Sequence, residues 1–240
     1  MSLPTMPPEL DAWQAFGTRV DDLLSSTLGG SDAALDRCLE HSAREGLPAI
    51  SVSLQQGRFL GLLASAIGAK RILEIGTLGG YSTIFLARAL PSGPLARVVS
   101  LELHPHHARV ARENLEFAKL GDRVEVVVGP AIDSFGALAT GHDPAAPFDF
   151  VFIDADKENI TRYFDLAVPL TRPGAIVIVD NIVRDGGVVD ADSTDPRVQG
   201  VRRFLEQMKS ETRVQAAGVQ TLGSKGYDGF AIARVLNPKG

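Results

Sequence analysis

The stretch that decides the fold is RILEIGTLGGYSTIFLARAL, residues 71–90. It begins as an apolar run, passes through glycines and continues with apolar residues at helical spacing. This order predicts a buried strand at 71–76, a tight turn and a helix over 81–90. Glycines at such a turn let the backbone approach a ligand closely, and the helix that follows directs its N-terminus at the same place. The stretch is therefore typical of a nucleotide-binding turn.

The spacing of the glycines narrows the class of nucleotide. Residues 76–80 read G-x-x-G-G, whereas a dinucleotide pyrophosphate loop reads G-x-G-x-x-G. Glu74 stands two residues before the first glycine, where it would repel a pyrophosphate and suit a cationic ligand. A strand-to-helix turn without any ligand is the alternative, because short glycine patterns match easily.

Outward from this stretch, β-rich runs alternate with helical segments. The further strands are expected at 98–103, 124–129, 148–156, 175–181, 213–219 and 229–235, and the helices between them at 106–121, 131–140, 159–170 and 198–210. Most of these strands are apolar throughout, as in a parallel sheet that is buried on both faces. The sequence thus predicts an α/β fold with a doubly wound, seven-stranded, mostly parallel sheet.

The residues before the sheet read mainly as helices. Segments 11–28, 31–46 and 54–69 have helical patterns, and 47–53 is expected to be extended. We expect one domain, with an N-terminal helical extension over 1–68 and the α/β core over 69–240. The first helix carries more apolar residues than one sheet face needs, which favours a homodimer over packing on its own core alone: Trp13, Phe16, Val20, Leu23 and Leu24.

Composition excludes several classes of protein. With 240 residues and a net charge of −5, the chain lacks the basic balance typical of a nucleic-acid surface. The single cysteine, Cys38, excludes an internal disulfide and a cysteine-cluster metal site. No apolar run approaches the ~20 residues that span a bilayer. The start, MSLPTMPPEL, lacks the order of a secretory signal. We expect a cytoplasmic protein without membrane contact.

Because ligands of doubly wound sheets bind at the carboxyl ends of the strands, the residues after each run are the candidates for a site. Glu102 ends the second strand, where a carboxylate can accept both hydroxyls of an adenosine ribose; a solvated acid is the alternative. After the third strand, Ala131 and its small neighbours suit a flat adenine ring, although an ordinary turn fits equally well. The HPHH run at 104–107 is expected to be exposed, with one histidine near the ribose, and not to bind a metal.

Acidic side chains follow the fourth and fifth strands. Asp154 ends one strand, and Asp180 and Asn181 end the next. These three hard oxygen ligands suit Mg²⁺ and would leave coordination positions open for a substrate. Lys157 follows in the same segment. Each acid taken singly could be a helix N-cap, but the set together favours a site.

These residues resemble the cation-dependent class I S-adenosylmethionine O-methyltransferases of the caffeoyl-CoA and catechol type, bacterial branch. The resemblance covers about residues 49–235 and rests on LEIGT and GYS, FIDADK, VDN and KGYDGFAIA. It implies a Rossmann-like fold with S-adenosylmethionine as co-substrate. This cofactor carries a positively charged sulfonium and no phosphates, so an acid near the turn is compatible with it. By motif match, the residues that line the cofactor would be Val52, Glu74, Gly76, Thr77, Ser82, Glu102, Ala131 and Asp154.

The same resemblance implies the catalytic set. Asp154, Asp180 and Asn181 would bind the divalent cation, and Lys157 matches the catalytic lysine. A phenol is little ionised at neutral pH, and a bound cation would stabilise its anion. A neighbouring cation would also favour the neutral amine of Lys157, which could take the proton. The implied reaction is methyl transfer to a hydroxyl of a catechol-like or hydroxycinnamoyl-type acceptor.

Three alternatives stay open. An NAD-dependent dehydrogenase would need a pyrophosphate loop, which the glycine spacing denies. A methyltransferase acting on wobble uridines of tRNA is disfavoured by the acidic net charge. A non-catalytic binding module on the same fold would have no use for Lys157.

Overall fold

A computed structural model of the chain describes residues 10–141 and 146–239. Eight α-helices lie in these ranges: α1 Leu10–Leu28, α2 Ala33–Arg44, α3 Leu54–Ala66, α4 Tyr81–Ala89, α5 Pro105–Phe117, α6 Ala131–Gly141, α7 Ile160–Ala167 and α8 Pro196–Met208. The seven strands are β1 Arg71–Ile75, β2 Arg97–Glu102, β3 Val124–Val128, β4 Phe148–Ile153, β5 Thr171–Asp180, β6 Val214–Gly223 and β7 Gly226–Val235. All seven expected strands are therefore confirmed.

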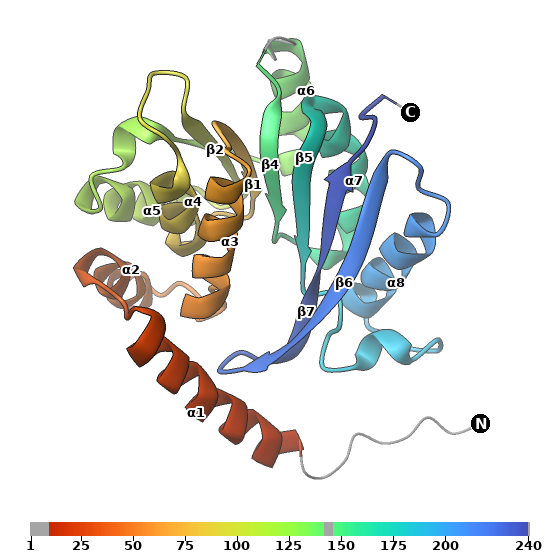
Figure 1. Cartoon of the computed structure of the whole chain (residues 1–240), viewed down its shortest axis with the longest axis horizontal. Helices are drawn as coiled ribbons and strands as arrows, with labels where there is room; N and C mark the ends of the chain where they lie inside the picture. The colour runs from red at the N-terminus through yellow and green to blue at the C-terminus, as the bar shows by residue number, and fades with distance from the viewer. Residues whose placement is uncertain (1–9, 142–145, 240) are drawn as a thin grey trace.

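The strands form one sheet in the order β3-β2-β1-β4-β5-β7-β6 (Figure 1). All neighbours are parallel except that β7 runs antiparallel to both β5 and β6. The mostly parallel, doubly wound sheet is confirmed. The order reverses between β1 and β4, and connections leaving these two strands diverge to opposite faces. A crevice is expected at their carboxyl ends.

Two apolar cores, one on each face of the sheet, explain the unbroken apolar runs. In β1, Ile72 belongs to the core under α3, α4 and α5, whereas Leu73 belongs to the core under α7 and α8. In β4, Phe150 and Val151 divide in the same way. Because successive side chains point to opposite faces, both positions must be apolar.

The expected boundaries differ from the structure at a few places. Segment 47–53 joins no strand and forms a loop before α3. The helix expected to reach residue 121 ends at Phe117, since Lys119 has a left-handed backbone (φ 58°) that ends the helical path. The sixth strand extends to Gly223 as one arm of a long hairpin with β7. The division between extension and core at residue 68 stays a prediction.

Helix α1 lies beside the hairpin of β6 and β7, near its turn, and contacts β6 (Figure 1). The carboxylate of Asp21 accepts hydrogen bonds from the backbone N–H (2.9 Å) and hydroxyl (3.0 Å) of Ser224 in that turn. In the described ranges, no helix combines the length and apolar character needed to span a membrane. The start of the chain, on which the secretory-signal expectation rests, lies outside the described residues, except for Leu10.

Candidate active site

A cavity of about 930 Å³ opens at the carboxyl ends of the parallel strands, beside the point where the strand order reverses. It brings together most of the residues singled out in the sequence. The expected site residues that line it are Val52, Gly76, Thr77, Ser82, Glu102, Ala131, Asp154, Lys157, Asp180 and Asn181. Glu74 is the exception. The loop 47–53, expected to be extended, supplies one wall of the cavity.

The glycine turn draws the end of β1 against the end of β4. Gly76 has a left-handed backbone (φ 102°), and a Cβ atom there would lie 2.1 Å from the carbonyl oxygen of Asp154. No other residue fits this contact, since real Cβ atoms do not approach a backbone oxygen so closely. Gly80 caps α4, also with positive φ. The glycines therefore set the distance between the turn and the acidic strand ends.

Glu74 lies beneath the cavity, with no exposed surface. Its Oε1 accepts a hydrogen bond from the Ser82 hydroxyl (2.6 Å), and its Oε2 accepts from Thr83 (2.5 Å) and Ser100 (2.6 Å). Burial raises the pKa of Glu74 to about 7, with a smaller contribution from the charge of Asp154 and against the lowering effect of the three hydroxyls. Glu74 reaches the cavity through Ser82, so direct contact with a ligand stays a prediction.

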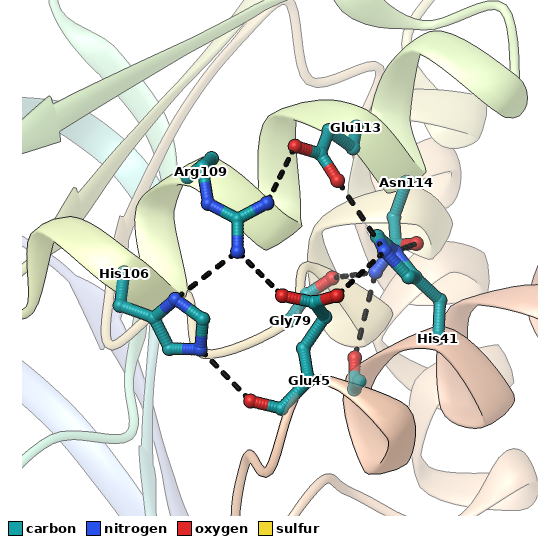
Figure 2. Close-up of polar contacts among 8 residues, drawn as sticks. His41, Glu45, Gly79, His106, Arg109, Glu113 and Asn114 are labelled. Carbon is teal, nitrogen blue, oxygen red and sulfur yellow. Dashed lines mark hydrogen bonds and ion pairs between the residues drawn. The ribbon is translucent and has the colours of Figure 1, made fainter.

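A polar network behind the turn ties it to α2 and α5 (Figure 2). The buried amide of Asn114 donates from Nδ2 to the carbonyl oxygen of Gly79 (2.9 Å), and its Oδ1 lies 2.8 Å from Nδ1 of His41. On the other side of the ring, Nε2 of His41 lies 3.3 Å from the carboxylate of Glu113. Arg109 binds that same carboxylate at 2.8 Å. The network fastens the backbone of the turn at Gly79 to α2 and α5.

The Glu102 carboxylate is buried at the end of β2. Its Oε2 accepts a hydrogen bond from the Leu78 N–H (2.8 Å), and its Oε1 accepts from the His104 N–H (2.9 Å). Nδ1 of His107 lies 3.4 Å from Oε1. Each carboxylate oxygen has lone pairs left for further donors, as a ribose diol requires. Ala131, at the first turn of α6, lines the neighbouring wall.

Two carboxylates of the cavity repel each other across the ends of β4 and β5. Asp180 is buried, and burial together with the charge of Asp154 raises its pKa to about 7, against the lowering effect of Lys157. Lys157, itself buried, donates from Nζ to Oδ1 of Asp154 (2.7 Å). Asn181 adopts a left-handed backbone (φ 60°), which asparagine tolerates better than most residues. The nearby Gln56 side chain also acts to lower the pKa of Asp180.

The histidine run is divided between two places. His104 and His107 line the cavity beside Glu102, as expected for one histidine, whereas His106 bonds the carbonyl oxygen of Glu45 at 2.8 Å. Within residues 10–141 and 146–239, no group of three or more His, Cys, Asp or Glu side chains is arranged to hold a metal. The expected ligand set falls outside that pattern because it joins two acids with an asparagine.

Sequence reasoning missed several cavity residues. Gln56 lies in the first turn of α3, a helix with no expected part in the site. Lys225 begins the motif KGYDGFAIA, and Arg184 follows the motif VDN by three residues. No rule of sequence spacing predicts that a residue after β5 and one in the β6–β7 turn line the same cavity. Tyr163 also lines the cavity, and its hydroxyl donates to Oδ1 of Asp156.

The chain matches a family model described as O-methyltransferase over residues 25–234. The catechol O-methyltransferase of Mycobacterium tuberculosis is 54% identical over 216 residues, which cover 90% of this chain and 94% of that protein.

Two solved structures share both fold and sequence. The O-methyltransferase from Bacillus cereus, in complex with SAH, superposes with a TM-score of 0.89 at 52% identity, over 92% of this chain and 99% of that chain. The O-methyltransferase TomG from Streptomyces achromogenes, in complex with SAM, has a TM-score of 0.88 at 46% identity, over 93% of this chain and 99% of that chain.

Proposed function

The chain belongs to the O-methyltransferase family, and from this premise we propose that it moves the methyl group of S-adenosylmethionine to a hydroxyl of a small aromatic acceptor, assisted by a divalent cation. The observation that carries the proposal is the meeting of the glycine turn, Glu102, the acid pair and Lys157 in one cavity. Catechol-like and hydroxycinnamoyl-type compounds are the acceptor classes that we expect.

The cofactor would lie along the glycine turn. Glu102 would accept the ribose hydroxyls, and Ala131 would lie against the adenine. The methionine part would extend past Gly76 and Ser82 toward Asp154, which would accept a hydrogen bond from its amine. Complexes of the Bacillus cereus and Streptomyces achromogenes relatives with SAH and SAM support this choice of cofactor.

The donor set fits a hard divalent cation. Asp154 and Asp180 both line the cavity, and burial together with the charge of Asp154 raises the pKa of Asp180. Asn181 adds an amide oxygen. Two carboxylates and an amide are ligands that Mg²⁺ accepts, with coordination positions to spare. When bound, the cation would lower the pKa of the acceptor hydroxyl and orient two neighbouring oxygens.

The protein's own residues would carry the proton and align the reactants. Lys157, in its neutral form, would accept the hydroxyl proton at Nζ. The acceptor oxygen would then bond to the methyl carbon while the carbon–sulfur bond breaks, which leaves S-adenosylhomocysteine. Holding oxygen, carbon and sulfur in line supplies much of the remaining acceleration.

We also propose a homodimer through α1. Apolar side chains of this helix are exposed in the single chain, among them Trp13, Phe16 and Leu23 at 54%, 55% and 64%. Large exposed apolar surfaces typically mark sites of interaction with another chain.

A screen with labelled S-adenosylmethionine tests the proposal. The panel holds catechols, hydroxycinnamoyl thioesters, flavonoids and total tRNA, each with and without Mg²⁺. Methylation of an aromatic acceptor only with Mg²⁺ is the expected result. Label found in tRNA alone would favour the nucleic-acid alternative. The family assignment favours neither this alternative nor the NAD-dependent dehydrogenase.

A further inference from the structure

Two cationic side chains line the cavity beyond the acid pair, where the acceptor would enter. Arg184 follows β5, and Lys225 lies in the turn between β6 and β7. Among the described residues, Lys225 has no ion-pair or hydrogen-bond partner; it is exposed to solvent at the edge of the cavity, and partial burial lowers the pKa of its ammonium group. The edge of the cavity therefore carries an ammonium group that no described side chain pairs with, and it is accessible to a ligand.

Within residues 10–141 and 146–239, the guanidinium of Arg184 forms an ion pair with Asp228 but no hydrogen bond. Its Nη1 lies 3.9 Å from Oδ2 of Asp228, which is beyond hydrogen-bond distance. Its Nε is buried without a partner within the described part of the chain. Because a buried donor that makes no hydrogen bond is costly, an acceptor from outside the chain is the simplest account of this side chain.

The backbone holds Arg184 in this position at a conformational cost. Arg184 and Asp185 both have left-handed backbones (φ 57° and 53°), which side chains rarely adopt. Oδ1 of Asp228 accepts hydrogen bonds from the backbone N–H groups of Val183 (3.0 Å), Arg184 (3.1 Å) and Gly229 (2.9 Å). Such strain persists where the surroundings over-determine it, and it concentrates at ligand sites.

The remaining charges of this edge have different roles. Arg197 is paired with Asp195, whose Oδ2 lies 2.6 Å from Nη2, so its charge is already compensated. Asp185 lines the cavity as an acid and would oppose an anionic ligand. Asp228 also lines the cavity and forms a long ion pair with Arg184 at 3.9 Å. Among the described cavity residues, Arg184 and Lys225 are the cations whose N–H donors make no hydrogen bond and can bind an anion.

Building on the proposed function, we propose that Arg184 and Lys225 bind a carboxylate on the methyl acceptor, so that the enzyme prefers dihydroxybenzoates to neutral catechol. A guanidinium presents paired N–H donors that match the two oxygens of a carboxylate. Lys225 supplies a second, mobile point charge. The acid pair would hold the hydroxyl end of the same ring, and the two cations would hold the acid end.

The test compares 3,4-dihydroxybenzoate with catechol in two measurements. The first is kcat/KM for each acceptor in the presence of S-adenosylmethionine and Mg²⁺. The second is the affinity of each acceptor for the protein loaded with S-adenosylhomocysteine and Mg²⁺. For each measurement, the readout is the ratio of acid to neutral acceptor. We expect a wild-type ratio above one, reduced by about ten- to hundredfold in Arg184→Met or Lys225→Met, the range for a charged hydrogen bond.

Two further variants make the test specific to charge at this place. Arg197→Met removes a cation that lines the cavity but is paired, and the ratio should stay near that of the wild type. Asp185→Asn removes the opposing acid, and the ratio should rise. A wild-type ratio at or below one, or a ratio unchanged in both Arg184→Met and Lys225→Met, overturns the proposal. If neither acceptor is methylated, the proposed function fails, and the affinity ratio still decides the role of the two cations.

Discussion

The ammonium group of Lys157 donates a hydrogen bond to Oδ1 of Asp154 across 2.7 Å, and both side chains face the cavity that Asp180 lines. The proposed base and a proposed cation ligand are thereby held as one unit in the short segment after β4. A change at Lys157 is therefore expected to act on proton transfer more than on cofactor binding, whereas a change at Asp154 should also weaken binding of the cation and the cofactor.

Replacing Lys157 should slow the chemical step. Lys157→Met should lower kcat by about 10²–10⁴-fold, the usual worth of a positioned general base. The loss should shrink at high pH, where the acceptor hydroxyl ionises without help. A pH profile of kcat for both proteins measures this, and calorimetry with S-adenosylhomocysteine should show cofactor affinity nearly unchanged.

The matched control for that change is Lys157→Arg, which keeps the positive charge beside Asp154 but does not release a proton in the accessible pH range. The arginine variant should be as slow as the methionine variant. Activity restored by arginine, or a loss that is constant across pH, would show that the charge of Lys157 matters and its basicity does not.

Removing the Glu102 carboxylate should weaken cofactor binding. Glu102→Ala removes the proposed acceptor of the ribose hydroxyls and the partner of two backbone N–H groups. We expect affinity for S-adenosylhomocysteine to fall by about 1–3 kcal/mol, the cost of losing a charged hydrogen-bond partner. Glu125→Ala, at an exposed acid of β3, is the control and should bind as the wild type does. Equal affinity of the two variants would move the ribose elsewhere.

Glu74 should make the ligand-free protein less stable as pH rises. Its folded-state pKa of about 7 lies above the 4.5 of an exposed glutamate, so the folded state holds the proton more tightly. That contribution is fully present below pH 4.5 and is lost as pH rises through 7, on the order of 3 kcal/mol. Asp180 acts in the same direction.

The contribution of Glu74 is isolated by Glu74→Gln. Denaturant unfolding at pH 5, 6, 7 and 8 gives the free energy of unfolding of each protein. The variant should lose less stability than the wild type over this range, because an amide does not titrate. Parallel curves would mean that Glu74 stays ionised in the folded protein.

The exposed face of α1 predicts a self-association that one substitution should break. Phe16→Asp places a charge among the apolar side chains of that helix and should convert a dimer into a monomer in sedimentation experiments. Leu95→Asp, at an even more exposed apolar residue between α4 and β2, should leave the dimer intact. A wild-type protein that sediments as a monomer at micromolar concentration would contradict the proposal.

The sequence predicts the sheet well for a physical reason. Both faces of the central strands are buried, so that Ile72 and Leu73 must both be apolar, and such runs stand out from the helices between them. The site follows because residues at the carboxyl ends of parallel strands share one edge, which brought Asp154 and Asp180 together.

Other features depend on contacts that no local pattern encodes. Glu74 lies beneath the cavity because the register of β1 with β2 places it opposite Ser100, whose hydroxyl it binds. Arg184 and Lys225 line one cavity because β7 inserts antiparallel between β5 and β6. The pairing of strands distant in sequence determines these positions.

The measurement that tests the central claim most directly is turnover after removal of divalent cations. Initial rates with catechol and S-adenosylmethionine are compared in excess chelator and after adding back Mg²⁺ or Mn²⁺, while calorimetry on the chelated sample measures affinity for S-adenosylhomocysteine. A cation held by Asp154, Asp180 and Asn181 predicts that chelation abolishes turnover, that either ion restores it, and that cofactor affinity is largely kept. Full activity in excess chelator would contradict this account and indicate a metal-independent transferase.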